Sequence, residues 1–336
     1  MRSTNKMINR LICSALIATV CLTGCATAKT SDYDLLETSY QYGIAHTSDV
    51  SKNLLYGSTV AISDGTDIGT DQVDSQVCTN AGCFNSTTRQ TLYAQSVHEK
   101  IYPASTTKIL TAYVALKYGN IDDTITVSEN AVAAADVDQS SNCSLKVGDH
   151  LTLRQLIYGM MLRSGNDAAV AIAEGVSGSV DEFMELCNKE AAALGATNTH
   201  FVTPNGLHDD DHYTTVYDMY LIFNAATELP EFVNIIATKS YDAYYTDASG
   251  NSTSQTWANT NQYITGSKSA PKGITIIGGK SGTTSEAAYC LVTLAENEAG
   301  DKLISLVYHA DCRYNLYLLT NELFSTFGRS DAEATQ

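Results

Sequence analysis

Three short segments of the chain contain the residue types that serine acyl transfer needs when no histidine takes part. They are Ser105-Thr106-Thr107-Lys108, Ser164-Gly165-Asn166 and Lys280-Ser281-Gly282-Thr283. Together they supply a nucleophilic hydroxyl, an amine that can act as its base, a second hydroxyl for proton transfer and a cation for a carboxylate. Each segment alone recurs by chance because its residues are common, but all three in this order indicate an enzyme.

The first segment is predicted to begin a helix over residues 105–118. Ser105 then lies at the helix N-terminus, where free backbone N–H groups and the helix dipole stabilise an oxyanion. Lys108 follows on the same helical face, so its amine can reach the Ser105 hydroxyl. A lysine is a good base at neutral pH only when burial or a nearby cation lowers its pKa by about 2–3 units. Lys280 is the candidate neighbour.

The second segment is predicted to form the turn between two helices. Residues 151–162 fit the first helix, with Thr152 and Gln155 as a capping box, and a second helix begins just beyond the segment. In such a turn the Ser164 hydroxyl can pass on a proton. The Asn166 amide can bind a substrate peptide through both its donor and its acceptor.

The third segment is predicted to follow the end of a strand. Residues 273–279 form a strand pattern, and Lys280 comes directly after it. Two further strands are predicted at residues 287–295 and 303–308, joined by a hairpin loop over residues 296–302. A strand edge that carries a lysine presents backbone N–H groups to a peptide and a cation to its C-terminal carboxylate.

The order of these elements predicts an α/β fold. Opening strands at residues 58–63 and 91–97 enclose an excursion rich in Gly, Asp and Cys, and helices fill residues 105–227. The three later strands then complete a mostly antiparallel sheet that uses both ends of the chain. A final helix is predicted over residues 314–327, and we expect no additional C-terminal β domain.

At these residues the chain resembles the penicillin-recognising serine enzymes, and among them the D-alanyl-D-alanine carboxypeptidases, the low-molecular-mass penicillin-binding proteins. The resemblance covers roughly residues 50–328 and extends to Pro204-Asn205-Gly206-Leu207 and Ala288-Tyr289-Cys290-Leu291. Ser281 stands where the family more often has threonine, and it keeps the hydroxyl. The resemblance implies a β-lactamase/transpeptidase-like sandwich, with a five-stranded sheet and a helical subdomain.

The resemblance also implies a role for each site residue. Ser105 would be acylated by the penultimate D-alanine of a peptidoglycan stem pentapeptide, or by a β-lactam such as penicillin, while Lys108 accepts its proton. Ser164 and Asn166 would complete the relay and hold the substrate. The segment Lys280-Ser281-Gly282-Thr283 would bind the terminal carboxylate, and the backbone N–H groups of Ser105 and Thr283 would form the oxyanion hole. Water would then release the acyl group, so we expect neither a metal nor an organic cofactor.

Two other functions stay open at this point. A β-lactamase uses the same acylation chemistry but needs a deacylating carboxylate, and no matching Glu motif follows Asn166. A non-catalytic lipoprotein that senses muropeptides or penicillin would also carry a reactive serine. The intact pair of Ser105 and Lys108 counts against such a sensor.

The N-terminus resembles a lipoprotein signal peptide over residues 1–24. Basic residues precede an apolar run, which closes with Leu22-Thr23-Gly24-Cys25. In this interpretation Cys25 is lipidated, residues 25–50 form a tether, and residues 51–330 are the catalytic domain, anchored at the bacterial membrane outside the cytoplasm. An ordinary secretory signal or a short uncleaved anchor is the alternative, and either would also place the domain outside the cytoplasm.

The composition excludes one class of partner. The formal net charge of −17 argues against nucleic acid, whose binding depends on Lys and Arg that neutralise phosphates. The closely spaced His208 and His212 are predicted to be solvated rather than to bind a metal, because no further ligand set accompanies them.

An address outside the cytoplasm permits disulfides. Cys78 and Cys83 flank a short loop sequence, Thr79-Asn80-Ala81-Gly82, and are predicted to form a local bridge. Cys290 lies inside a strand pattern and is predicted to be a buried free thiol.

Overall fold

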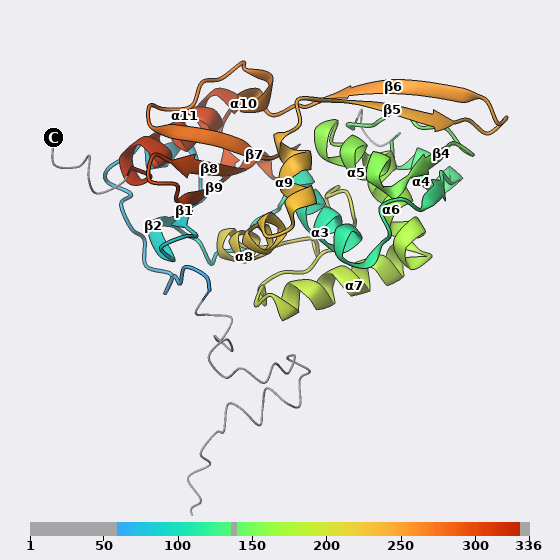
Figure 1. Ribbon diagram of the computed structural model, residues 1–336. Coiled ribbons are helices and arrows are strands. Elements are labelled where there is room, and N and C mark those ends of the chain that lie inside the picture. The colour runs from blue at the N-terminus through green and yellow to red at the C-terminus, as the bar shows by residue number, and fades with distance from the viewer. Residues whose placement is uncertain (1–58, 136–139, 330–336) are drawn as a thin grey trace, which may run out of the picture. The chain divides into compact units, whose positions relative to one another are not determined.

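The structure is a computed structural model that describes residues 59–135 and 140–329 (Figure 1). The predicted signal peptide (1–24), Cys25 and the predicted tether (25–50) lie outside the described residues. None of the helices in the described ranges is both long and apolar enough to span a bilayer. The described residues belong to one compact unit that contains a five-stranded sheet, a four-stranded sheet and helices.

The five-stranded sheet combines strands from both ends of the chain, as predicted. Its order is β2-β1-β9-β8-β7, and every neighbouring pair is antiparallel. The strands are β1 (Asn80–Asn85), β2 (Gln90–Gln95), β7 (Ile274–Thr284), β8 (Ala288–Asn297) and β9 (Lys302–Ala310). The hairpin predicted over residues 296–302 is confirmed, since β8 and β9 pair on either side of it.

The prediction for the first strand is wrong. Residues 58–63 form no strand where they are described, and β1 lies instead inside the predicted excursion. All six residues of β1, including two asparagines and a glycine, are buried. A strand buried on both faces shows no alternation of polar and apolar residues, so its sequence was mistaken for a loop.

The predicted Cys78–Cys83 bridge is also wrong. Cys83 lies inside β1 and is fully buried, and both thiols are free. The loop that the bridge was expected to close is a strand, which fixes these residues by pairing with its neighbours. Cys290 is confirmed as a buried free thiol, and all six cysteines in the described ranges are free.

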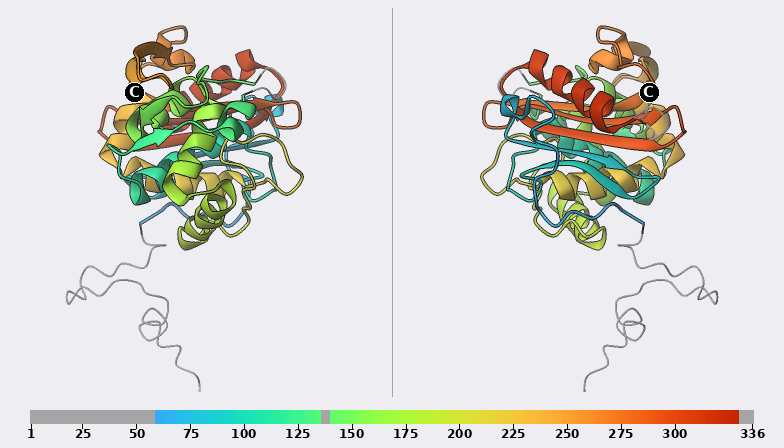
Figure 2. Two further views of the ribbon diagram at one scale, coloured as in Figure 1. Left: turned by 90° about the vertical axis from the view of Figure 1, so that its right-hand side faces the viewer. Right: turned by 90° about the vertical axis from the view of Figure 1, so that its left-hand side faces the viewer.

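The two faces of the five-stranded sheet are covered by different helices. Along β9, Leu303 and Val307 pack on the side of α11 (Arg313–Phe327), whereas Ile304 and Leu306 pack on the side of α8 (Val216–Thr227). Figures 1 and 2 show these two helices on opposite sides of the sheet. Alternate residues of each strand thus serve two cores, which is the expected consequence of the two-residue period of a strand.

The helical subdomain lies between the opening and closing strands of that sheet in the sequence (Figure 1). Its helices are η3 (Ala104–Thr107), α3 (Lys108–Tyr118), α4 (Glu129–Ala133), α5 (Leu153–Leu162), α6 (Asn166–Ser177), α7 (Val180–Ala193) and α9 (Pro230–Ala237). Short elements outside it are η2 (Ser75–Val77) and α10 (Gln262–Thr265). The first eight residues of α3 are buried, so this helix is the centre of the subdomain.

The four-stranded sheet was not predicted from the sequence. Its order is β3-β4-β5-β6, formed by β3 (Thr124–Thr126), β4 (His150–Thr152), β5 (Ser240–Thr246) and β6 (Ser252–Ala258). β3 and β4 have only three residues each, and the hairpin of β5 and β6 is rich in Ser, Thr and Tyr. Such short and polar strands carry little hydrophobic periodicity.

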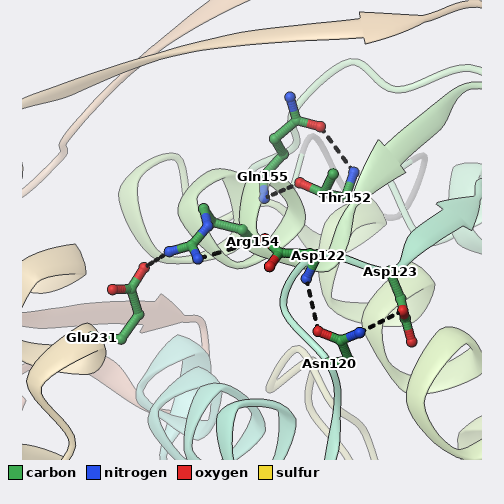
Figure 3. Close-up of polar contacts among 7 residues, drawn as sticks. All are labelled: Asn120, Asp122, Asp123, Thr152, Arg154, Gln155 and Glu231. Carbon is green, nitrogen blue, oxygen red and sulfur yellow. Dashed lines mark hydrogen bonds and ion pairs between the residues drawn. The ribbon is translucent and has the colours of Figure 1, made fainter.

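The start of α5 is fixed by the capping box that the sequence predicts (Figure 3). The Gln155 backbone N–H donates to Thr152 Oγ1 at 3.2 Å, and the Thr152 N–H donates to Gln155 Oε1 at 2.8 Å. Beside them, Arg154 forms ion pairs with Asp122 and with Glu231 of α9. These contacts hold α5 in place, and the turn that carries the second motif follows its C-terminus.

Candidate active site

Ser105 lies in a tight turn rather than in the first turn of an α-helix. Residues 104–107 form the 3₁₀ helix η3, and α3 begins at Lys108. Ala104 has a positive φ of 47°, an uncommon conformation for alanine. Strained backbone of this kind is frequent at functional sites, where the surrounding structure enforces it.

The amine of Lys108 meets the Ser105 hydroxyl. Lys108 Nζ lies 3.1 Å from Ser105 Oγ, 2.7 Å from Asn166 Oδ1 and 2.5 Å from the Asn205 carbonyl oxygen. A neutral amine has two N–H donors and one lone pair. It can therefore donate to Asn166 and Asn205 while its lone pair accepts the proton of Ser105.

Two causes favour the neutral form of Lys108, whose side chain is fully buried. Burial is the larger cause that holds its pKa well below the usual value, and the positive charge of Lys280 lowers the pKa further. The negative charge of Asp167 acts in the opposite direction and is the weaker influence. The predicted effect of Lys280 on Lys108 is thus confirmed in direction.

The second motif forms the turn that the sequence predicts. Ser164 lies between α5 and α6 with a φ of 59°, and Asn166 is the first residue of α6. The backbone N–H of Asn166 donates to the Ser141 carbonyl oxygen at 2.9 Å. Ser164 Oγ accepts a hydrogen bond from Lys280 Nζ at 2.9 Å, so this hydroxyl connects the second motif to the third.

Lys280 lies in the interior of β7 and not at its end. The strand continues to Thr284, and Lys280 is opposite Val292 of β8. Glycine is needed in this strand for close packing. A Cβ on Gly279 would lie 2.0 Å from the Val292 carbonyl oxygen.

The side chain of Lys280 is almost fully buried, with 1% of its surface exposed. Its Nζ donates to Ser164 Oγ and, at 2.8 Å, to the carbonyl oxygen of its neighbour Ser281. Burial lowers the pKa of Lys280 to about 7. An ammonium has three N–H groups, so Lys280 keeps one donor beyond these two acceptors.

Gly282 brings the third motif against the nucleophile. A Cβ at this position would lie 2.9 Å from the Ser105 backbone nitrogen and 3.0 Å from the Ala104 Cβ. Only glycine allows β7 to approach the turn this closely. The Ser105 N–H therefore lies beside the strand that carries Thr283, the second residue assigned to the oxyanion hole from the sequence.

A cleft of about 190 Å³ opens over these residues. Ser105, Ser164, Ser281, Gly282 and Thr283 line it, whereas Lys108 and Lys280 lie beneath its surface. Seven further residues, all outside the three motifs, also line it: Ser141, Thr260, Gln262, Tyr289, Arg313, Leu316 and Tyr317. The lining set contains no Asp or Glu within the described ranges.

Two groups at the site carried no usable signal in the sequence. The Asn205 carbonyl contacts Lys108, but a backbone oxygen has no residue signature. Arg313 begins α11 and forms no ion pair with any acidic side chain in the described part of the chain. Only its position in space, at the edge of the cleft, distinguishes it from other surface arginines.

Of the two histidines predicted to be solvated, His208 is exposed as expected, but His212 is not. His212 is buried, with 2% of its surface exposed, rather than solvated. It hydrogen-bonds to Thr107 of the nucleophile turn. Among the described residues no group of His, Cys, Asp or Glu is arranged to hold a metal ion.

A serine that meets a buried lysine three residues away, beside a strand that carries a second buried lysine, defines a serine enzyme of the Ser-x-x-Lys class. The profile of peptidase family S11, the D-alanyl-D-alanine carboxypeptidases, matches residues 71–312. The chain belongs to this family. The match lies inside the predicted catalytic domain (51–330), whose bounds stay a prediction.

Relatives of known sequence and structure agree with this assignment. The chain is 36% identical over 230 residues to the D-alanyl-D-alanine carboxypeptidase DacF of Bacillus subtilis, covering 66% of this chain and 55% of that protein. It is 35% identical over 233 residues to the D-alanyl-D-alanine carboxypeptidase of Streptomyces sp. strain K15, covering 67% of this chain and 78% of that protein. The chain thus spans only about half the length of DacF.

The fold has solved counterparts. The crystal structure of the Streptomyces K15 DD-transpeptidase superposes with a TM-score of 0.69 at 31% identity, covering 74% of this chain and 96% of that chain. The predicted α/β architecture, with a five-stranded antiparallel sheet and a helical subdomain, is therefore confirmed.

Proposed function

We propose that this protein is a serine D-Ala-D-Ala carboxypeptidase that removes the terminal D-alanine from peptidoglycan stem pentapeptides and is acylated by penicillins. One observation carries the proposal: Lys108 Nζ lies 3.1 Å from Ser105 Oγ at the base of a cleft that all three motifs form. Membership of the D-alanyl-D-alanine carboxypeptidase family supports the substrate class.

In the acylation step, Ser105 Oγ attacks the carbonyl carbon of the penultimate D-alanine. Its proton passes to the neutral amine of Lys108, for which burial provides the low pKa. The oxyanion forms beside the backbone N–H groups of Ser105 and Thr283. Loss of one such donor typically costs about 3–4 kcal/mol in transition-state stabilisation.

The leaving D-alanine takes its proton through Ser164. This hydroxyl lines the cleft and is hydrogen-bonded to Lys280, so it can transfer a proton between the lysines and the leaving amine. Asn166 holds the Lys108 amine through its Oδ1. Water then attacks the ester carbonyl, which releases the tetrapeptide and restores the Ser105 hydroxyl.

The terminal carboxylate binds on the opposite side of the cleft. Ser281 and Thr283 offer hydroxyl groups there, and the Lys280 charge lies beneath them. Arg313 supplies a guanidinium that has no acidic partner among the described residues and suits a carboxylate. We therefore add Arg313 to the carboxylate site that the sequence predicted.

A defined pentapeptide that ends in D-Ala-D-Ala tests the proposal, with mass analysis of its products. We expect a tetrapeptide and free D-alanine from the wild type and no product from Ser105→Ala. A peptide that ends in L-alanine is the control. Release of D-alanine by Ser105→Ala would contradict the assignment of the nucleophile.

The same assay separates the two alternatives. A β-lactamase would hydrolyse penicillin rapidly without releasing D-alanine, and a sensor would bind penicillin covalently without turning over peptide. The absence of Asp and Glu from the described lining of the cleft favours the carboxypeptidase, because the glutamate-dependent deacylation of one large group of lactamases needs a carboxylate. Addition of an acceptor amine measures any transpeptidation.

We also propose that the enzyme acts outside the cytoplasm, on the bacterial cell wall, and is anchored through a lipidated Cys25. The basic and apolar sequence before Cys25 supports this anchor, because diacylation is strong enough to hold a protein at a membrane. Cys25→Ser tests it. The variant should carry no radiolabelled lipid and should appear in the soluble fraction. A Cys25→Ser variant that is still labelled and membrane-bound would contradict the proposal that Cys25 carries the anchor.

A further inference from the structure

The loop over residues 202–212 packs directly on the nucleophile turn. Its Asn205 carbonyl accepts from Lys108 Nζ, and its Pro204 carbonyl accepts from Thr111 Oγ1 at 2.7 Å. Gly206, with a φ of 82°, passes so near the turn that a Cβ would lie 1.9 Å from the Ala104 carbonyl oxygen. The position of this loop and that of the turn are therefore coupled.

Two adjacent threonines hold the turn from opposite sides. Thr106 Oγ1 donates to the Pro103 carbonyl at 2.7 Å, and Thr107 Oγ1 donates to the Ala104 carbonyl at 2.9 Å. Each hydroxyl has one further partner. Thr106 is hydrogen-bonded to Tyr308 of β9 at 3.0 Å, and Thr107 is hydrogen-bonded to a side chain of the loop.

That partner is His212, and its hydrogen bonds fix which ring nitrogen carries the proton. Nδ1 accepts from the backbone N–H groups of Val202 at 3.0 Å and Thr203 at 3.2 Å. Nε2 must then carry the hydrogen and donate to Thr107 Oγ1 at 2.8 Å, because the single Thr107 proton is used on Ala104. The imidazole thus has a donor and an acceptor that are both satisfied.

The surroundings of the His212 imidazole favour its neutral form. Burial lowers the pKa of His212 to about 3 and outweighs the opposing influence of Asp209. Phe201 packs against the imidazole with ring centroids 5.3 Å apart. A neutral, enclosed imidazole can fix the position of its hydrogen-bond partner but does not transfer protons. It does not titrate at physiological pH, and it does not line the cleft.

We infer that His212 is a positioning residue for the acylation of Ser105, acting through Thr107 and the Ala104 carbonyl to hold the nucleophile turn against the loop that binds Lys108. Ala104 has a positive φ, and the Thr107 hydroxyl is bonded to its carbonyl. Without the His212 donor this hydroxyl is held on one side only. The inference rests on the proposed function, because it concerns the same serine.

Variants of the two partners test the inference. Thr107→Val removes the hydroxyl and keeps the shape, Thr107→Ser keeps the hydroxyl, and His212→Phe keeps a ring without either nitrogen. His200→Phe is the matched control, because His200 lies in the same region and its ring nitrogen bonds only to a loop carbonyl at the surface. Stopped-flow reaction with a fluorescent penicillin separates the binding constant from the acylation rate constant.

We expect Thr107→Val and His212→Phe to slow acylation by about 10- to 100-fold, with the binding constant unchanged, because a small displacement of reacting groups has effects of this size. Thr107→Ser and His200→Phe should stay within about threefold of the wild type. The double variant Thr107→Val/His212→Phe should be no slower than the slower single variant, since both break one connection.

The outcomes distinguish this inference from the proposed function. The inference would be overturned if the Thr107→Val variant were acylated at the wild-type rate, or if its binding constant changed instead of its acylation rate constant. This test holds even if the His212→Phe variant fails to fold. A lower unfolding temperature with an unchanged acylation rate would show a purely structural role and would also overturn it. A wild-type protein that neither reacts with penicillin nor releases D-alanine would contradict the proposed function itself.

Discussion

Two regions of the cleft each bury a lysine, but they hold it in different ways. Lys108 is held by groups from distant parts of the chain, Asn166 on α6 and the Asn205 carbonyl, in addition to Ser105. Lys280 bonds to the carbonyl of its own neighbour Ser281 and to one hydroxyl across the cleft.

These surroundings suit the two lysines to different functions. The Lys108 amine has an acceptor for every N–H that a neutral amine carries, and its lone pair is left for Ser105, which suits a base. Lys280 retains a donor and lies under hydroxyls that line the cleft, which suits a fixed positive charge beside a carboxylate. One kind of side chain is thus suited to two different functions because its surroundings differ.

Removal of the base, Lys108, should have the largest effect on the rate of acylation. Lys108→Met keeps the apolar stem and is expected to slow acylation by penicillin about 10²- to 10⁴-fold, the usual contribution of a positioned base. Lys117→Met is the control on the same helix, because Lys117 is 42% exposed and pairs with Glu190. Acylation of Lys108→Met at the wild-type rate would show that the base lies elsewhere.

Removal of the carboxylate-side cation should have a smaller and substrate-dependent effect. Lys280→Met is expected to lower kcat/KM for the pentapeptide by about 10- to 100-fold, as for loss of a charge-assisted interaction of about 1.5–3 kcal/mol. The same peptide with a C-terminal amide should be affected much less. The substitution should also raise the pKa of Lys108, because Lys280 lowers it, so the acidic limb of the acylation profile should move to higher pH. Equal losses on both peptides would contradict carboxylate recognition.

Substitutions of two glycines test whether the site around Lys108 depends on the loop over residues 202–212. Gly206→Ala should slow acylation at least about tenfold and lower the unfolding temperature, because its Cβ would overlap the Ala104 carbonyl oxygen. Gly250 has nearly the same φ, 83°, and a Cβ added there would have no atom within 4 Å. Gly250→Ala should therefore lose only about 1–2 kcal/mol of stability and no activity. Similar acylation rates in both variants would disprove the coupling.

The pH dependence of the free energy of unfolding tests whether burial lowers the pKa of Lys280. Because the folded-state pKa is about 7 and the reference value is 10.5, the unfolded chain binds more protons between these values. The free energy of unfolding of the wild type relative to Lys280→Met should therefore rise as pH increases from about 7 to 10.5. Denaturant titrations at several pH values measure this difference. A difference that is flat with pH would mean that Lys280 keeps an ordinary pKa in the folded protein.

The parts of the molecule that the sequence predicted are those with a local pattern. The capping box of α5, the hairpin between β8 and β9 and the turn at Ser164 each depend on residues close in the chain. The convergence of the motifs followed from their resemblance to a family with known spatial relations. β1 was missed because it is buried on both faces and shows no alternation.

The groups that escaped prediction act through the backbone or through burial. The Asn205 carbonyl is defined only by where the loop passes. His212 was predicted to be solvated because it lies close to His208 in a turn-rich segment after Gly206. The predicted strand end at Lys280 was misplaced, because the strand continues to Thr284 through glycines that permit close packing. Long-range packing decides these features, and no short window of sequence contains it.

Three distant segments of the chain converge on the hydroxyl of Ser105, and we infer that this is the reactive group. The most direct test is to react the protein with a penicillin, digest it and locate the added mass by tandem mass spectrometry. We expect one adduct per molecule, on Ser105, and none in Ser105→Ala. An adduct on Ser164 or another residue, or an unmodified Ser105 after complete reaction, would contradict this inference.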